Sequence, residues 1–182
     1  MTKHQTRMAL RRVQKGASLL EGIAYLGIAA IVVIGAIALL NTAFSSANSN
    51  ELNSELSAIQ TASRKLFMTT QGNYGATDFT PTLIAAKGFP QTLTTDAADG
   101  TVADAWGGSV TVAPVAADNT RFTITYTKVP PDVCVNALTS TTTGWLQVLG
   151  PGSAQAVVPP ISPGSAQTAC GNAAGTVVWT SS

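Results

Sequence analysis

The chain has 182 residues and a formal net charge of +1, with 45% hydrophobic and 10% charged residues. This composition excludes a disordered, highly charged tail, and the scattered basic residues after position 16 exclude a phosphate-tracking stripe for nucleic acid. The length predicts one domain plus an anchor.

Positive charge is concentrated at the N-terminus. Residues 1–16 hold five of the ten Lys and Arg residues and none of the acids. The remainder holds five basic and nine acidic residues, which is a net charge of −4. The positive-inside rule therefore predicts a cytoplasmic N-terminus and an external body.

A long uncharged run follows the basic segment. No charged residue occurs between positions 22 and 50. The apolar part, 22–44, is about 23 residues, or ~34 Å as a helix, which is enough to cross a hydrocarbon core. One carboxylate, Glu21, stands directly before the run. At a bilayer centre such a group costs on the order of 3 kcal/mol, so a bare anchor has no reason to keep it.

Three interpretations of residues 1–50 compete. A signal peptide is the first, although its apolar region is usually only about 7–15 residues long; a small-residue cut site is present near 45–47. A single-pass anchor is the second, and it leaves Glu21 unexplained. In the third, the bond between Gly16 and Ala17 is cut at the cytoplasmic face, and Glu21 becomes the fifth residue of the mature chain.

The third pattern resembles the class III leader of type IV prepilins. That leader combines a basic segment, Gly at the cut, Glu five residues on and an uninterrupted apolar helix; Lys15, Gly16, Ala17 and Glu21 supply these features here. Cleavage would create an α-amine on Ala17 with a pKa of about 8. A carboxylate buried among packed helices needs a cation. The resemblance thus implies that Glu21 meets the terminal amine of a neighbouring subunit.

The 16-residue leader is longer than those typical of type IVa pilins and pseudopilins, and Ala17 replaces the usual type IVa phenylalanine. The chain looks most like PilS-type pilins of the type IVb subgroup. This resemblance implies a homopolymer, cleavage by the prepilin peptidase, an inner-membrane platform with its ATPase, and a secretin. It also implies a path from the inner membrane to a surface fibre used in adhesion, cell–cell contact or conjugative mating.

Two other functions remain open. Within the family, the alternative is a minor pilin or a type II secretion pseudopilin. Outside the family, it is a membrane-anchored extracytoplasmic binding module that never polymerises. The expected organisation is a leader at 1–16, a helix at 17–70 and a head at 71–182 whose C-terminal region, 134–170, is bounded by a disulfide.

Helical periodicity continues past the apolar run to about residue 70. The apolar positions Leu52, Leu56 and Ile59 predict a stripe that packs on the head. The polar residues between them, Glu51, Glu55, Gln60 and Arg64, are expected to face elsewhere. A short second helix is predicted next, with Thr80 as its cap, Pro81 at its first position and Gly88 as its stop.

The last part of the chain predicts a sheet. Val, Thr, Ile and aromatic residues are frequent at 109–115, 120–129, 144–149 and 175–180. A hairpin turn is expected at 117–119 and a short helix over 130–138. Two copies of Pro-Gly-Ser-Ala-Gln, at 151–155 and 163–167, are expected in surface loops. The predicted fold class is α+β, with a pilin-like helix packed on an antiparallel sheet.

The sequence offers little for catalysis. Two cysteines, Cys134 and Cys170, predict one disulfide in an oxidising compartment. The only histidine, His4, lies in the leader, so Ser-His and Cys-His catalysis and His-ligated metal sites are not expected in the mature chain. We expect no enzyme activity and no cofactor. For the acidic residues Asp96, Asp99 and Asp104, calcium binding is an alternative to a solvated loop.

Overall fold

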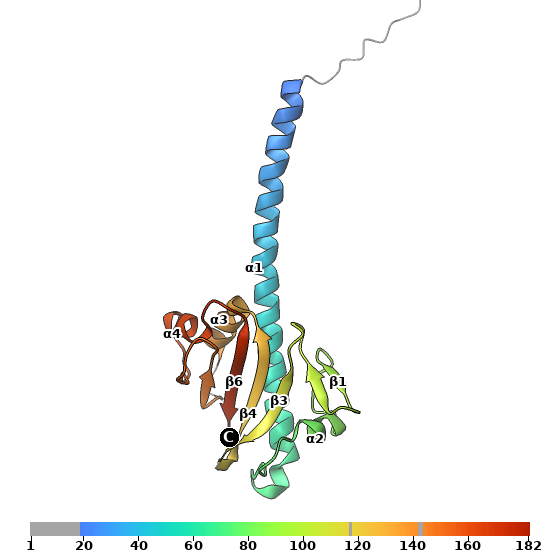
Figure 1. The fold of residues 1–182 in the computed structure, drawn as a ribbon, viewed down its shortest axis with the longest axis vertical. Helices are drawn as coiled ribbons and strands as arrows, with labels where there is room; N and C mark the ends of the chain where they lie inside the picture. Colours follow the sequence, from blue (N-terminus) through green and yellow to red (C-terminus); the bar gives the residue numbers. More distant parts are fainter. Residues whose placement is uncertain (1–18, 117, 142–143) are drawn as a thin grey trace, which may run out of the picture. The chain divides into compact units, whose positions relative to one another are not determined.

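The computed structural model describes residues 19–116, 118–141 and 144–182, without the side chain of Asn41. Its contacts divide the chain into two compact units, Met1–Asn41 and Thr42–Ser182. Helix α1 (Leu19–Leu66) supplies the described part of the first unit and the first element of the second (Figure 1).

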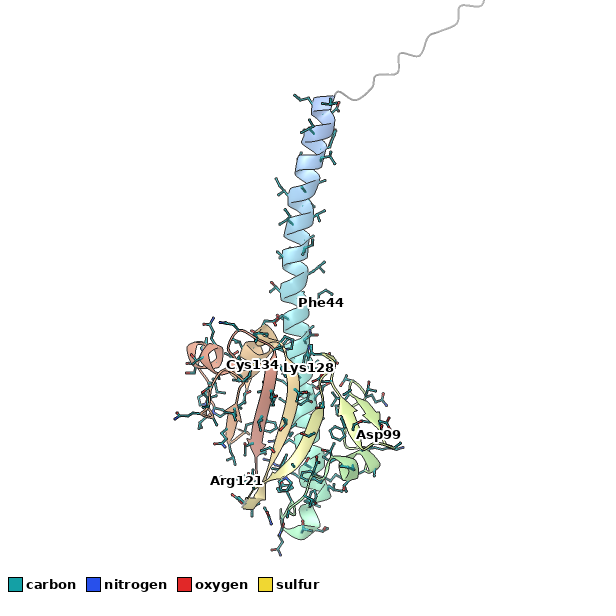
Figure 2. All side chains as sticks on the ribbon, in the orientation of Figure 1. Phe44, Asp99, Arg121, Lys128 and Cys134 are labelled. Atoms are coloured by element: carbon teal, nitrogen blue, oxygen red, sulfur yellow. A yellow bond between two sulfur atoms is a disulfide. The ribbon has the colours of Figure 1, made fainter. Side chains whose placement is uncertain are left out.

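Residues 19–41 form a helix without a proline or a charged residue after Glu21. Leu, Ala and Ile dominate the segment, and these residues form helices readily or at modest cost. Apolar side chains project from this part of α1 around its circumference (Figure 2). None of the side chains described between 19 and 40 is buried, so the described part of this unit has no core of its own.

In the second unit, α1 buries one stripe of side chains. The stripe runs along successive turns and consists of Ser45, Ser49, Leu52, Glu55, Leu56, Ile59 and Ser63. The three to four residue spacing keeps it on one helix face. The predicted apolar members of this stripe are therefore confirmed, while its two ends are made of serine. The helix ends at Leu66 and is followed by a 3-10 turn, Met68–Thr70, and a left-handed Gln71.

A four-stranded antiparallel sheet packs against this stripe. Its strand order is β3 (Val110–Val115), β4 (Asp118–Val129), β6 (Gly175–Ser181) and β5 (Gln147–Leu149). The inward residues of β4, Phe122, Ile124 and Tyr126, are fully buried and share one core with Leu52 and Leu56. The predicted α+β class and antiparallel sheet are confirmed.

Two details of the sheet differ from the prediction. Strand β4 begins at Asp118, so Asp118 and Asn119 belong to the strand and not to the turn before it, because Asp118 pairs with Val115. Ala117, the other predicted turn residue, lies outside the described residues. Strand β5 covers only the last three residues of the predicted 144–149 segment.

In the sequence, α1 and β3 are separated by α2 (Thr80–Ala85) and by a hairpin of β1 (Thr94–Asp96) and β2 (Thr101–Ala103). The helix was predicted, but Thr80 is its first residue and does not cap it; the N-cap position is Phe79. The Thr80 hydroxyl accepts a hydrogen bond from the Val112 amide (2.7 Å) and so ties α2 to β3. The left-handed residue after the helix is Lys87, not Gly88. Gly88 is needed for space, because a Cβ there would crowd Leu83 and Ala62.

At the opposite edge of the sheet from α2 lie α3 (Pro131–Ser140) and α4 (Pro163–Cys170) (Figure 1). Helix α3 starts where the Pro-Pro-Asp pattern predicts. Helix α4 corrects the prediction of a loop at 163–167, because the Ser162 hydroxyl caps the helix by accepting from the Ser165 amide and Ala166 packs into the core. The earlier copy of the same five-residue word, 151–155, is not helical.

Candidate functional site

Glu21 lies in the first turn of α1. The helix dipole and the unpaired amides of a first turn favour a carboxylate at this place. Gly16 and Ala17, which form the predicted cleavage site, lie outside the described residues. Cleavage between them and the pairing of Glu21 with a terminal amine therefore stay predictions.

The residues after Glu21 present an apolar surface. Large hydrophobic side chains at positions 19–40 are more than half exposed, including Leu26, Ile31 and Leu39. Among the described residues, α1 is long and apolar enough to cross a membrane, as judged by length and composition. Such a surface is rarely left in water, so it is suited to lipid or to packing against other helices.

The second unit contains an acidic side chain whose orientation was predicted wrongly from the sequence. Glu55 was expected to face away from the head, but its side chain is only 6% exposed and points to the sheet. One carboxylate oxygen accepts a hydrogen bond from the Thr92 hydroxyl (2.6 Å) and the other from the Tyr126 hydroxyl (3.1 Å). Burial raises the pKa of Glu55, and the negative charges of Glu51 and Asp104 act in the same direction. The same burial, with Glu55 nearby, raises the pKa of Tyr126.

Asp104 shapes the loop that leads into the sheet. Its Oδ1 accepts hydrogen bonds from the amides of Trp106 (3.0 Å) and Gly108 (2.7 Å). Its Oδ2 is buried and has no hydrogen-bond partner among the described residues. The Lys128 ammonium closes the loop from the sheet side by donating to the Gly107 carbonyl (2.9 Å). The loop holds Ala105 and Trp106 beside Glu51 and Glu55 of α1.

Two polar residues of α1 bind the last strand. Gln60 donates from its amide nitrogen to the Gly144 carbonyl (2.9 Å) and to the Ser181 hydroxyl (2.8 Å). Arg64 donates to the Ser182 carbonyl (2.8 Å) and to the same Ser181 hydroxyl (3.0 Å). The expectation that these side chains face elsewhere is therefore wrong, because they join α1 to the end of β6.

Cys134 and Cys170 form a disulfide that joins α3 to α4, with Cα atoms 5.9 Å apart. Both cysteines are buried (Figure 2 labels Cys134). The predicted disulfide is confirmed. It fastens α4 to α3 across a chain segment, 150–162, that contributes only Ile161 to the buried core.

The described residues contain no group of three or more His, Cys, Asp or Glu that could hold a metal ion. Asp96 accepts hydrogen bonds from the amides of Ala98 and Asp99, so its carboxylate stabilises the hairpin tip. Asp99 is exposed at this tip. The calcium alternative therefore has no support from this geometry.

A hollow of about 400 Å³ lies beside α2 and contains one titratable side chain, Lys87. Its other lining residues are Ile84, Phe89, Pro90, Gln91, Leu93 and Thr95. It combines no acid, base and nucleophile of the kind that acyl or phosphoryl transfer requires.

A family model called PilS, described as "PilS N terminal", matches residues 46–182, which is three quarters of the chain. The chain belongs to the PilS family. This result confirms the type IV pilin resemblance, type IVb subgroup, that was inferred from residues 15–40. The match lies entirely in the second unit and is therefore independent of the leader motif that suggested the family.

Among solved structures, the PilS-family chain is similar to TcpA, a type IV pilin from Vibrio cholerae El Tor biotype. The two share 16% sequence identity with a TM-score of 0.51, and the alignment covers 74% of this chain and 99% of TcpA. At this identity the likeness shows the fold alone, a pilin-like helix and sheet. A search of curated proteins found no match.

The sequence-predicted features of this PilS-family chain are found in both units. Glu21 and the apolar surface belong to the first unit, and the disulfide belongs to the second. Sequence reasoning missed the buried Glu55 and its partners Thr92 and Tyr126. Their separation of 37 and 71 residues along the chain left no local signal, although an acid beside the apolar position Leu56 was visible.

Proposed function

We propose that this chain is the major structural subunit of a type IVb pilus. In this proposal the prepilin peptidase removes residues 1–16, and the apolar helix anchors the subunit in the inner membrane before assembly. A platform protein and its ATPase then move it into a fibre that leaves through a secretin. The fibre serves adhesion, cell–cell contact or conjugative mating, and the subunit has no enzymatic activity and binds no cofactor or nucleic acid.

One observation carries this proposal: a single carboxylate, Glu21, in the first turn of a helix with no other charge up to position 50. An apolar rod of this kind buries its surface against other copies once it leaves lipid. In the packed rod a carboxylate needs a cation, and the α-amine of Ala17 from a neighbouring copy is the cation that cleavage supplies. The PilS family match and the pilin-like fold support the same assignment.

Mass analysis of the N-terminus tests processing. We expect subunits from sheared fibres to begin at Ala17, and Gly16→Val to keep the full leader. An intact Met1 in the finished protein would contradict cleavage and favour a membrane-anchored binding module. The abundance of this chain in the sheared fibres separates a major subunit, which dominates the preparation, from a minor pilin or pseudopilin.

Substitution of Glu21 tests assembly. We expect Glu21→Gln to be cleaved and to reach the membrane but to give far fewer fibres, because the neighbouring amine loses its anion. Glu51→Gln is a matched control, since Glu51 is an exposed acid of the same helix outside the apolar run. A wild-type fibre yield from Glu21→Gln would show that the pairing role is wrong.

A further inference from the structure

Glu55 connects three elements that are distant in the sequence. Its side chain projects from α1. The carboxylate accepts one hydrogen bond from Thr92 in the α2–β1 connection (residues 86–93) and another from Tyr126 on β4. In the α2–β1 connection Leu93 is buried, residues 88–90 are half-buried, and the others, Thr92 among them, are exposed. The hydrogen bond from Thr92 to Glu55 is a polar contact between this connection and α1, and Gly88 also lies close to Ala62 of α1.

The charges around Glu55 are unfavourable to an anion. The charged groups that act on it are Glu51 on α1 and Asp104 in the loop before β3, and both are acids. Tyr126 on β4 contributes a hydroxyl, not a charge. No Lys or Arg of the described residues acts on Glu55. Asp104 is itself only 9% exposed and keeps one oxygen without a hydrogen bond among the described residues.

The two protonation states of Glu55 differ in what they need. As a neutral acid, Glu55 keeps both contacts, because a hydroxyl such as that of Tyr126 accepts as well as donates a hydrogen bond. As an anion, it is stabilised by the hydroxyl donors of Thr92 and Tyr126, but burial and the neighbouring carboxylates of Glu51 and Asp104 oppose its charge more strongly. Water can reach Glu55 when the exposed Thr92 moves away from it, and a small hollow of about 10 Å³ lined by Ala105 and Trp106 borders Glu55 on another side.

We propose that Glu55 is a proton-controlled latch that fastens the α2–β1 connection to α1. With the proton bound, Glu55 holds Thr92 and Tyr126 together. Loss of the proton leaves an anion among acids, and the connection opens to hydrate it. The rest of the second unit stays folded, because Leu52, Leu56 and the β4 residues Phe122 and Ile124 stay buried in the core and have no hydrogen bond to Glu55.

The sign of the pH effect follows from the raised pKa of Glu55. In the folded chain the group keeps its proton at pH values where the unfolded chain, with an ordinary value of 4.5, has lost it. The folded state therefore binds more protons in this window, and the free energy of unfolding falls as the pH rises through the pKa of the folded state. The stabilisation is fully present below pH 4.5.

Hydrogen exchange of the full-length protein in detergent tests the latch. After correction for the intrinsic rate, we expect protection of residues 86–93 to fall several-fold as the pH rises above 4.5. Glu55→Gln should keep high protection at every pH, because glutamine keeps hydrogen bonds and cannot ionise. Glu51→Gln should retain the pH dependence, with its midpoint at lower pH. If protection in wild type and Glu55→Gln changes with pH in the same way, the proposal is wrong.

A second variant and a direct probe remain informative even where Glu55→Gln does not fold. Tyr126→Phe removes a donor to the anion, so the midpoint of the pH transition should move to higher pH. An infrared spectrum of wild type should also contain the band of a protonated carboxyl at a pH where exposed acids are ionised. An unmoved midpoint in Tyr126→Phe or the lack of that band would overturn the latch.

Discussion

Gly108 is a residue at which the backbone leaves no room for a side chain. A Cβ at this position would overlap the carbonyl oxygen of Thr127 and the Asp104 carboxylate. Because the first of these is backbone in β4, a rotamer change cannot relieve the overlap. We expect Gly108→Ala to lower the free energy of unfolding by about 1–3 kcal/mol, as measured by denaturant titration of the full-length protein in detergent.

Gly164 is the matched control for this substitution. It lies in α4 and has nothing within 4 Å of its hypothetical Cβ. Gly164→Ala should therefore be neutral or stabilise the chain by about 0.5–1 kcal/mol, since alanine favours a helix. Equal effects of the two substitutions would show that the Asp104–Gly108 loop is not tightly packed.

Single residues differ in how far the sequence predicts them. Glu21 was recognisable because its chemistry depends on neighbours in the sequence, namely the basic leader and the apolar run. Glu55 was not, since the rule that acids face solvent is overridden by partners from the α2–β1 connection and β4. Tertiary contacts decide whether such a group is buried, and the helical periodicity of a sequence carries no information about them.

Among the elements, the buried stripe of α1 carries the contact with the sheet. Leu56 is almost fully buried in the common core. Leu56→Ala should lower the free energy of unfolding by about 2–5 kcal/mol, because the cavity left behind is enclosed by rigid strands. Ser57→Ala, one position along on the exposed face, should stay within about 0.5 kcal/mol of wild type. Chemical denaturation in detergent measures both.

The disulfide between α3 and α4 is a second contact at this scale. It joins residues 36 apart around a segment with few core side chains. Replacing Cys134 and Cys170 together by alanine should lower the free energy of unfolding by about 3–4 kcal/mol in the loop-entropy model. Wild type treated with a reductant should show a comparable loss. A double variant as stable as the oxidised wild type would mean that packing of α3 on α4 suffices.

Elements with a strong period were predicted and elements without one were not. The alternation of Thr with Phe122, Ile124 and Tyr126 in β4 and the proline start of α3 are local signals, and both were confirmed. The β1–β2 hairpin was missed because its strands are three residues long and mostly exposed. Helix α4 was missed because Pro-Gly-Ser-Ala-Gln also occurs without a helix; the cap from Ser162 and burial of Ala166 separate the two copies.

At the scale of the whole molecule, the two units differ in where their stability comes from. All the side chains of the buried hydrophobic core lie at or after Leu52, and they form a single cluster. Residues 19–40 bury none of the described side chains within the chain. The PilS match begins at residue 46, so it also follows the second unit rather than the apolar helix.

A fragment of residues 42–182 tests this division. We expect it to fold with its disulfide and to remain soluble without detergent, because it keeps the whole core and loses the exposed apolar surface of 19–40. Circular dichroism and size-exclusion chromatography measure folding and solubility, with the full-length protein in detergent as the reference.

The fragment should not enter fibres, since it lacks both Glu21 and the apolar helix. An unfolded fragment would show that residues 19–41 contribute to the stability of the head. A folded fragment that enters fibres would instead place the assembly contacts in the head and contradict polymerisation through the helix.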